Sequence, residues 1–504
     1  MIEAIHGYTI GCRIYLNQCK IWVCCNAVWS TAAAGASHPT RRIERPGMRP
    51  HPHVMTSIRR ELYDRHLWAG RVLVVTFAAL AGLTVVSFTW LTEHALAQFF
   101  ALNKSYWWAP LIWTPLSTAA IVWLTMRFAP GAGGSGIPQV MAALEPSAQG
   151  SARALFVSVR LSIAKMFLSA WGLLAGLSLG REGPSVQIAA GVMHHARRWM
   201  PKRAQVTEHS LLIAGGAAGI AAAFNTPLGG VMFAIEELAK RPEQRSNGLI
   251  LAAIVLGGLM AVSAYGSASY FGVIRVDKFG TALIVPAILV VLATGFAGGL
   301  FSRLLIASLS GLSPDWFSQF RRNNPIRFAA GCGMGVAILG VVSHGETYGS
   351  GYAHTRAILE NNGDTFSLYV LFKFVATWLT TWSGVPGGVF APSLAIGGAL
   401  GNDIAQITSY VSAPTLVALG MAGFLAAVTQ APMTAFIIVM EMVDGHALVL
   451  SLMASAMVAS AISRLISAPL YPTLADIQLR RIAQPLPEKK GAHKGSELTH
   501  MDNP

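Results

Sequence analysis

Long apolar stretches dominate the chain between about residue 72 and residue 467, and short polar connections separate them. An α-helix needs about 20 apolar residues to cross the hydrocarbon core of a bilayer, and many of these stretches reach that length. Segments 72–98 and 107–128 have the pattern of ordinary membrane spans. The pattern predicts an all-α, polytopic membrane protein with one large membrane domain over residues 61–480.

After the second span, clusters of Gly and Pro repeatedly interrupt the apolar stretches. The interruptions are residues 131–138, 180–184, 225–230, 384–392 and 430–432. Backbone that leaves the helical path at membrane depth is tolerated only where it is buried in protein or lines an aqueous cavity. We therefore expect broken and re-entrant helices around a central site.

The interruptions also repeat along the chain. Pro184-Ser185 followed by Ile188 reappears 208 residues later as Pro392-Ser393 followed by Ile396. Ala221-Ala222, Pro227 and Glu236 recur 205 residues later as Ala426-Ala427, Pro432 and Glu441. Two pairs at nearly the same offset favour two inverted-topology halves, about 69–270 and 271–480, with a site between them. The alternative is chance similarity between Gly/Ala-rich helices.

Composition agrees with a membrane protein. Of the 504 residues 53% are hydrophobic and 12% are charged, and the mean hydropathy is +0.50; an average soluble domain has roughly 25% charged residues. The net charge of +14 comes largely from short connectors, which is typical of cytoplasmic loops and argues against nucleic-acid binding. These connectors contain Arg197, Arg198, Lys202 and Arg203; Lys240, Arg241 and Arg245; and Arg321, Arg322 and Arg327. The basic residues before the first span place the N-terminus in the cytoplasm.

Both ends of the chain differ from the membrane domain. Residues 1–60 have weak periodicity, and we expect a disordered extension or a misassigned start, with Met48 or Met55 as the true one. Four cysteines lie there and imply no disulfide framework, although they could bind metal. They are Cys12, Cys19, Cys24 and Cys25. Residues 481–504 are expected to form a polar cytoplasmic tail without a further domain.

Two of the Gly/Pro clusters have the composition of an anion site. Unpaired N–H groups and the dipole at a helix N-terminus attract anions, glycines let the backbone approach the ion, and proline suits the first helical turn. Residues 134–138 (GSGIP) and 387–392 (GGVFAP) each precede a new helical segment. The hydroxyl of Ser135 could donate to the anion directly. Taken singly, each cluster could instead be a packing element or a kink.

Glu182 is the lone acid between Ser151 and Met200, at the start of a predicted helix in residues 180–184 (GREGP). An acid inside the membrane is costly and marks a functional site by default. Its carboxylate could occupy the amide groups that bind the anion and leave them when it is protonated, which would couple anion passage to proton movement. The alternatives are a local pair with Arg181 or an ordinary N-terminal cap.

Glu236 and Glu237 end an apolar helix just before basic residues, so they should lie near the cytoplasmic surface, where one of them could collect protons. A salt bridge with the adjacent basic residues is the alternative. Glu441 occupies the equivalent place in the second half, and we expect it to be structural. Tyr471 begins a last short helix and would otherwise be an interfacial aromatic residue.

These features together resemble the ClC family of chloride channels and proton-coupled chloride transporters. The match covers about residues 69–480 and rests on GSGIP, GREGP, GGVFAP and the segment AAFNTPLGGVMFAIEE at 222–237. The resemblance implies that Glu182 is the external gate and proton carrier and that Glu237 is the internal proton-transfer acid. It also implies a set of chloride-binding residues: Ser135, Gly136, Ile137, Val389, Phe390 and Tyr471.

The resemblance implies a chloride/proton antiporter, because Glu237 matches an acid that exchangers carry and channel members generally lack. Ser135 looks like the chloride-preferring form. A passive chloride channel, gated by voltage or pH, is the alternative. The family also implies a homodimer, no cofactor and a bacterial inner membrane location. A membrane enzyme is a third possibility, with a metal centre at His194, His195 and His209, but adjacent histidines lack the usual helical ligand spacing.

Overall fold

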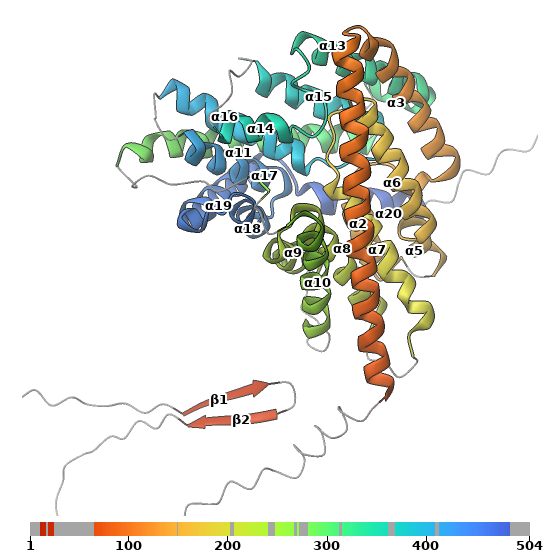
Figure 1. The fold of residues 1–504 in the computed structure, drawn as a ribbon, viewed down its shortest axis with the longest axis vertical. Coiled ribbons are helices and arrows are strands. Elements are labelled where there is room, and N and C mark those ends of the chain that lie inside the picture. The colour runs from red at the N-terminus through yellow and green to blue at the C-terminus, as the bar shows by residue number, and fades with distance from the viewer. Residues whose placement is uncertain are drawn as a thin grey trace, which may run out of the picture.

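The computed structural model describes residues 11–16, 19–24, 65–148, 150–201, 206–239, 247–266, 270–271, 281–311, 315–360, 368–408 and 413–483. Over residues 65–483 the described elements are all helical (Figure 1). The prediction of an all-α membrane fold is confirmed for this body. Two short antiparallel strands, β1 (Gly11–Leu16) and β2 (Cys19–Cys24), pair outside it, with Gly11 opposite Cys24. The other predictions for residues 1–60, the cysteine side chains included, and for residues 484–504 lie outside the described residues.

The helices of the first half run from the N-terminal span to the middle of the chain. They are α2 (Arg65–Ser105), α3 (Ala109–Phe128), η1 (Pro130–Ala132), α4 (Ile137–Leu144), α5 (Ser151–Phe156), α6 (Val159–Leu174), α7 (Glu182–His195), η2 (Ala196–Trp199), α8 (Glu208–Phe224), α9 (Pro227–Phe233), the π-helix η3 (Ala234–Leu238) and α10 (Asn247–Tyr265).

The helices of the second half continue to the end of the described chain. They are η4 (Thr281–Leu283), α11 (Ile284–Ser310), α12 (Trp316–Asn323), α13 (Pro325–Val342), α14 (Tyr352–Leu359), α15 (Tyr369–Ser383), α16 (Phe390–Ile407), α17 (Ala413–Thr429), α18 (Pro432–Met442), η5 (His446–Leu448), α19 (Val449–Ile466) and α20 (Leu470–Ala483).

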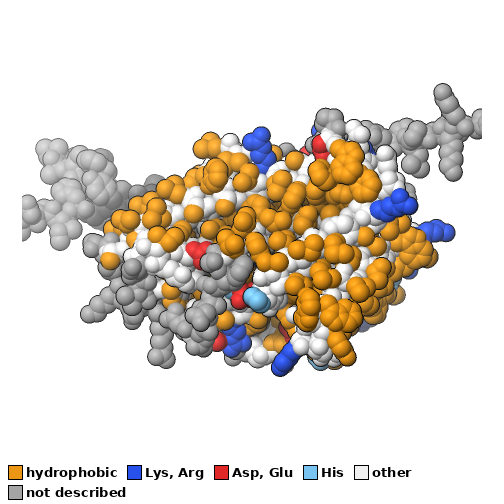
Figure 2. Space-filling view, turned by 90° about the horizontal axis from the view of Figure 1, so that it is seen from above, with side chains coloured by type: hydrophobic (Ala, Val, Ile, Leu, Met, Phe, Trp, Pro, Cys, Tyr) orange, Lys and Arg blue, Asp and Glu red, His pale blue; other side chains and the backbone are white. Residues whose placement is uncertain are grey.

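The described part of the chain contains seven helices that are long and apolar enough to cross a membrane. The two predicted spans fall within α2 and α3. Large apolar side chains cover much of the outer surface, as Figure 2 shows for one face. Leu465, for example, is 88% exposed. Water would penalise such a surface and lipid would not, so the fold is that of a multi-pass membrane protein.

The core between the halves is built from helices too short or too buried to be ordinary spans. Every residue of α8 from Ser210 to Phe224 is buried, as is every residue of α17 from Thr415 to Thr429. Helix α8 packs on α7, and α17 packs on α16. Glycines allow this close approach: a Cβ added at Gly219 would lie 2.6 Å from the carbonyl oxygen of Ser185, and one at Gly420 would lie 2.2 Å from that of Gly397.

The two halves break their helices in the same way. Asn225 ends α8 with φ 58°, and Gln430 follows α17 with φ 61°. These residues stand 205 residues apart, the offset already found in the sequence. A non-glycine residue rarely adopts this left-handed conformation, so its recurrence at the same break supports a duplicated scaffold.

The last helix joins the halves. Helix α20 belongs to the second half, but it packs against α4 of the first, and Figure 1 shows it among helices of the first half. Helices α16 to α19 lie on one side of this view, and α2, α6, α7 and α8 lie on the other. Because Tyr471 is at the start of α20, this packing carries it to the loop that precedes α4.

Candidate functional site

Three of the predicted helix interruptions meet at the interface between the halves. Gly180 and Gly388 pair like two residues of a sheet: the amide of Gly180 donates to the carbonyl of Gly388 at 2.7 Å, and the reverse bond is 2.8 Å. The amide of Gly387 donates to the carbonyl of Gly134 at 3.1 Å. Backbone bonds therefore fasten together the loops that carry GSGIP, GREGP and GGVFAP.

Glycine is required where these loops approach one another. A Cβ on Gly183 would lie 2.4 Å from Oγ of Ser135, and one on Gly136 would lie 2.6 Å from the carbonyl oxygen of Gly183. Gly136 also has φ 109°, a conformation that side chains other than glycine rarely adopt. The spacing of glycines in the motifs thus reflects contact between their backbones.

Three helices begin at this junction: α4 at Ile137, α7 at Glu182 and α16 at Phe390. The first amides of each helix have no carbonyl partner within their own helix, and the helix dipole adds partial positive charge there. The junction, called the pocket below, is therefore electropositive, as the sequence predicted for an anion site, and the cations that flank it, Lys165 and Arg181, donate to other groups.

The carboxylate of Glu182 lies inside this pocket and is 1% exposed. Its Oε2 accepts a hydrogen bond of 3.4 Å from the amide of Ala391, in the first turn of α16. Its Oε1 is buried and has no hydrogen-bond partner among the described residues. An acid from one half thus reaches the helix N-terminus of the other half.

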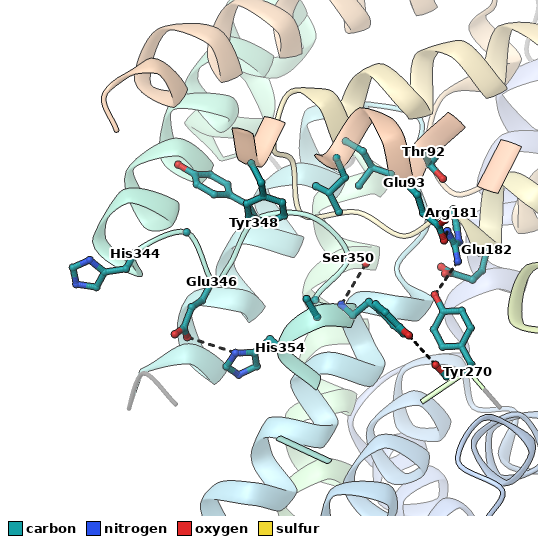
Figure 3. A pocket seen from close by; sticks show the side chains of 17 residues that line it. Thr92, Glu93, Arg181, Glu182, Tyr270, His344, Glu346, Tyr348, Ser350 and His354 are labelled. Carbon is teal, nitrogen blue, oxygen red and sulfur yellow. Dashed lines mark hydrogen bonds and ion pairs between the residues drawn. The ribbon is translucent and has the colours of Figure 1, made fainter. Parts of the chain in front are cut away.

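Arg181 forms no salt bridge with Glu182 among the described residues, although its charge lies close enough to act on the Glu182 carboxylate. Its guanidinium donates to Oε1 of Glu93 at 2.7 Å and to the hydroxyl of Tyr270 at 3.0 Å. A cavity of about 380 Å³ adjoins this group and reaches Glu182 (Figure 3). Glu182 therefore stands between the pocket and this outer cavity.

The hydroxyls of Ser135 and Tyr471 lie on the other side of the pocket. Both are buried and lie in each other's vicinity, and neither has a hydrogen-bond partner of good geometry within the described structure. The Tyr471 side chain is close enough to interact with Ser135 and with the charges of Glu182 and Glu237. Its ring stacks on Phe390, with 5.9 Å between centroids and 14° between planes.

Two buried hydroxyl donors without partners are costly unless a ligand takes their hydrogen bonds. They lie beside the three helix N-termini, where the remaining predicted residues are also buried: Gly136, Ile137 and Val389. The structure thus brings together the residues that the sequence analysis assigned to chloride binding, although the amide of Gly136 donates to Oε1 of Gln139 at 2.9 Å.

Lys165 supports the GSGIP loop, and the sequence analysis missed it. Its ammonium group is buried and donates to the carbonyls of Ala132 at 2.7 Å and Gly134 at 2.6 Å. These bonds hold the backbone immediately before Ser135. The available signal was a single lysine within the apolar stretch of α6.

The adjacent acids Glu236 and Glu237 have different surroundings. Glu236 accepts hydrogen bonds from the amides of Met433 at 3.2 Å and Thr434 at 2.7 Å, at the start of α18. Glu237 is 6% exposed and acts electrostatically on Tyr471. Glu236 is therefore engaged by the backbone of the other half, and Glu237 is the more deeply buried of the two acids.

Glu441 reciprocates the contact of Glu236. Its carboxylate accepts hydrogen bonds from the amides of Leu228 at 3.1 Å and Gly229 at 2.8 Å, at the start of α9. Each half thus supplies an acid that caps a helix of the other half. This arrangement gives Glu441 the structural role that its position suggested.

The histidines considered as a metal centre have other contacts. Nε2 of His194 lies 3.6 Å from Oε2 of Glu208, and His195 packs edge-on against Trp199 with 5.0 Å between ring centroids. Within the described ranges, no group of three or more His, Cys, Asp or Glu side chains is arranged to hold a metal ion.

Fold and site define a polytopic α-helical membrane protein with a buried polar pocket between two related halves. The family model described as "Voltage gated chloride channel" matches residues 116–464. The chain therefore belongs to the voltage gated chloride channel family, as the motifs indicated.

Named relatives and solved structures agree with this assignment. The chain is 30% identical over 460 residues to the H(+)/Cl(-) exchange transporter ClcA of Cronobacter sakazakii, covering 86% of this chain and 94% of that protein. It is 30% identical over 418 residues to the ClcA of Citrobacter koseri, covering 78% and 85%. Its fold resembles a slow cyanobacterial Cl-/H+ antiporter, with a TM-score of 0.69, 24% identity and coverage of 82% of this chain and 99% of that one. A CLC-type fluoride/proton antiporter gives a TM-score of 0.65 at 22% identity, covering 81% and 98%.

Proposed function

We propose that this protein is a chloride/proton antiporter and is not an enzyme. The observation that carries the proposal is the position of Glu182, whose carboxylate meets the N-terminus of α16 above two buried hydroxyls without partners. A carboxylate and a chloride ion compete for the same amide and hydroxyl donors. The relatives named as H(+)/Cl(-) exchange transporters support the proposal.

Chloride in the central pocket would take hydrogen bonds from Ser135 and Tyr471. The amides of Ile137, Val389 and Phe390 would complete its surroundings, and Gly136, whose amide donates to Oε1 of Gln139 at 2.9 Å, would contribute through the close approach of its backbone. This site offers donors and partial charge, and the flanking cations Lys165 and Arg181 are engaged by other groups, so the ion can bind and still leave. The site needs no cofactor, since transport only exchanges bound ions.

Glu182 would couple the two ions by moving. While ionised, it occupies the donors next to Ala391 and closes the route between the pocket and the outer cavity. When a proton arrives, the neutral acid loses its preference for these donors, swings away and admits an anion. Each proton taken up or released thus accompanies a change in anion access.

Glu237 would carry protons to and from the other side of the membrane. It is buried next to the pocket, and Glu236 is engaged with the amides of Met433 and Thr434. A buried acid at this place favours the exchanger over a passive chloride channel, because a channel needs no proton carrier.

Uphill proton movement tests the proposal directly. Proteoliposomes loaded with chloride are diluted into low-chloride buffer, with valinomycin and equal potassium holding the membrane potential at zero. We expect chloride efflux to drive protons inward against a pH gradient, with internal acidification reported by a trapped dye. Chloride efflux without proton uptake would identify a passive channel, and the absence of chloride efflux would remove both functions.

We also propose a homodimer in a bacterial inner membrane, with both termini in the cytoplasm. An apolar groove between α11 and α19 supports the dimer, because residues such as Ile288, Leu292 and Val458 line a cavity of about 620 Å³ open to the surface. Light scattering of the detergent-solubilised protein should give twice the chain mass. A monomer mass would contradict this part of the proposal.

A further inference from the structure

A second cavity, of about 680 Å³, lies beside the loop that precedes α4 and combines apolar lining with arginine side chains. The C-terminal half of α3, the end of α11, helix α12, the start of α13, the end of α15 and helix α20 form its other walls. Its lining includes Gly133, which directly precedes the GSGIP motif. On α20 the lining includes Arg480, nine residues after Tyr471. The cavity therefore borders both elements that supply hydroxyls to the chloride pocket.

Four arginines line this second cavity: Arg321, Arg322, Arg480 and Arg481. No carboxylate is among its described lining residues. Asp315 interacts with Arg322, but its carboxylate caps α12 by accepting a hydrogen bond of 3.0 Å from the amide of Ser318. Arg321 and Arg481 lie close enough for their charges to repel each other. Positive charge is thus concentrated here without an internal counter-ion.

Three of these arginines are held in place by the C-terminal carbonyls of α11. Arg321 donates to Ser308 at 2.8 Å, Arg481 donates to Leu309 at 3.0 Å and Ser310 at 3.3 Å, and Arg322 donates to Gly311. A helix C-terminus carries only about half a negative charge, so these contacts offset a small part of four positive charges. Each guanidinium has five N–H donors, and most remain available.

We propose that this arginine cavity binds a phosphate-bearing ligand. Planar guanidinium groups bind phosphate oxygens in pairs, and the arginines are already oriented by their carbonyl partners. The volume lies within the range of roughly 300–1,000 Å³ typical of small-molecule sites, far more than one chloride ion needs. The chemistry fits either a soluble polyphosphate or the phosphomonoester headgroup of a lipid. This inference goes beyond the proposed function, and binding can be measured without transport.

The binding test uses inorganic tripolyphosphate and the purified full-length protein in isothermal titration calorimetry. We expect Arg480→Gln to weaken binding by about tenfold, the loss of one charge-assisted contact, and Arg322→Gln combined with it to weaken binding further. Arg480 is chosen because it is not among the arginines that hold the end of α11. Arg327→Gln, an exposed arginine of α13 outside the lining, is the matched control and should bind like the wild type.

A flux experiment separates the two ligand sources. Chloride efflux is compared in phosphatidylcholine vesicles with and without phosphatidic acid, and with and without tripolyphosphate on the side of the cavity. A lipid ligand predicts that phosphatidic acid changes the flux of the wild type but not of Arg480→Gln; a soluble ligand predicts the same pattern for tripolyphosphate. If neither probe acts through Arg480, and the substitution changes only the chloride dependence of flux, the arginines merely concentrate chloride and the inference is wrong.

Discussion

The two halves of this protein share a scaffold but differ in the residues proposed to carry protons. Glu182 begins α7, and Phe390 begins α16 at the equivalent place 208 residues later. Glu237 likewise corresponds to Met442 at the offset of 205 residues. The second half thus has apolar residues where the first has its two buried acids. Duplication therefore supplies the shared helical scaffold, and the first half alone supplies the two acids proposed to carry protons.

Polar residues that hold the frame, in contrast, occur in both halves. Lys165 and Lys373 stand 208 residues apart, and Glu236 and Glu441 stand 205 apart. Lys373 donates to the carbonyls of Thr347 at 2.9 Å and Gly349 at 2.7 Å, just as Lys165 holds its own loop. Buried polar groups of this kind need partners, so the partners recur with them.

The loops held by these lysines are also copies. Gly134-Ser135-Gly136 precedes α4, and Gly349-Ser350-Gly351 precedes α14, with positive φ at both glycines of each loop. Their serines differ in use. Oγ of Ser350 accepts a 3.4 Å hydrogen bond from the amide of Tyr352 and lines the outer cavity, whereas Oγ of Ser135 is buried without a partner beside Tyr471.

Replacing Glu182, the acid that α7 has and α16 lacks, should have the largest effect on coupled proton transport. Glu182→Gln removes the titratable group but keeps its shape, so coupled proton uptake should fall by roughly a hundredfold or more, as when a proton-transfer group is lost. Chloride should still pass. The measurement is proton uptake and chloride efflux in the same proteoliposomes.

Phe390→Leu is the matched control in the second half. It changes packing against Tyr471 but removes no titratable group, so the number of protons moved per chloride should stay the same even if the rates change. Proton coupling that survives Glu182→Gln, or vanishes in Phe390→Leu, would show that the halves do not divide the chemistry as proposed.

The second acid should show a narrower effect. Glu237→Gln is expected to reduce proton flux by about tenfold or more through loss of a proton carrier, while chloride flux stays near the wild-type value. Met442→Leu, at the corresponding place of the second half, should change neither ion flux. Equal loss of both fluxes in Glu237→Gln would indicate a structural role instead.

Sequence reasoning recovered the frame better than the contacts that hold it together. Hydropathy predicted α2 and α3, and the isolated position of Glu182 among apolar residues identified the acid at the start of α7. The pairing of Gly180 with Gly388 joins residues far apart in the chain, so only the family resemblance indicated that their loops share a site. The sequence contains a second Gly-Ser-Gly at residues 349–351, and the sequence analysis did not use this repeat.

The contacts that could not be predicted are those that cross between the halves. The spacing of Glu236 and Glu441 shows that the two acids are equivalent. The sequence does not show, however, which distant helix each carboxylate caps. The hydrogen bonds of Glu236 to α18 and of Glu441 to α9 follow from the packing of both pairs of helices. The carbonyl partners of Lys165 likewise depend on where the loop before α4 comes to rest.

The reciprocal caps should contribute to stability about equally. Glu236→Ala and Glu441→Ala each remove two hydrogen bonds to helix amides, so each should lower the free energy of unfolding by about 1–3 kcal/mol. Thermal unfolding of the detergent-solubilised protein, followed by circular dichroism, measures both variants. The number of protons moved per chloride should stay unchanged in each. Loss of proton coupling in Glu236→Ala without loss of stability would assign Glu236 to the proton route.

The smallest effect on transport is expected from replacing Lys165, and the same change at Lys373, its counterpart in the second half, is the control. Lys165→Met and Lys373→Met each leave two buried loop carbonyls without their donor, so both should destabilise the protein. Only the loop of Lys165 carries a serine of the chloride pocket. Lys165→Met should therefore also weaken chloride binding by about fivefold, which corresponds to about 1 kcal/mol, whereas Lys373→Met should leave it unchanged. Calorimetric titration with chloride measures the difference, and equal affinities in the two variants would mean that the loop before α4 does not need its lysine to position Ser135.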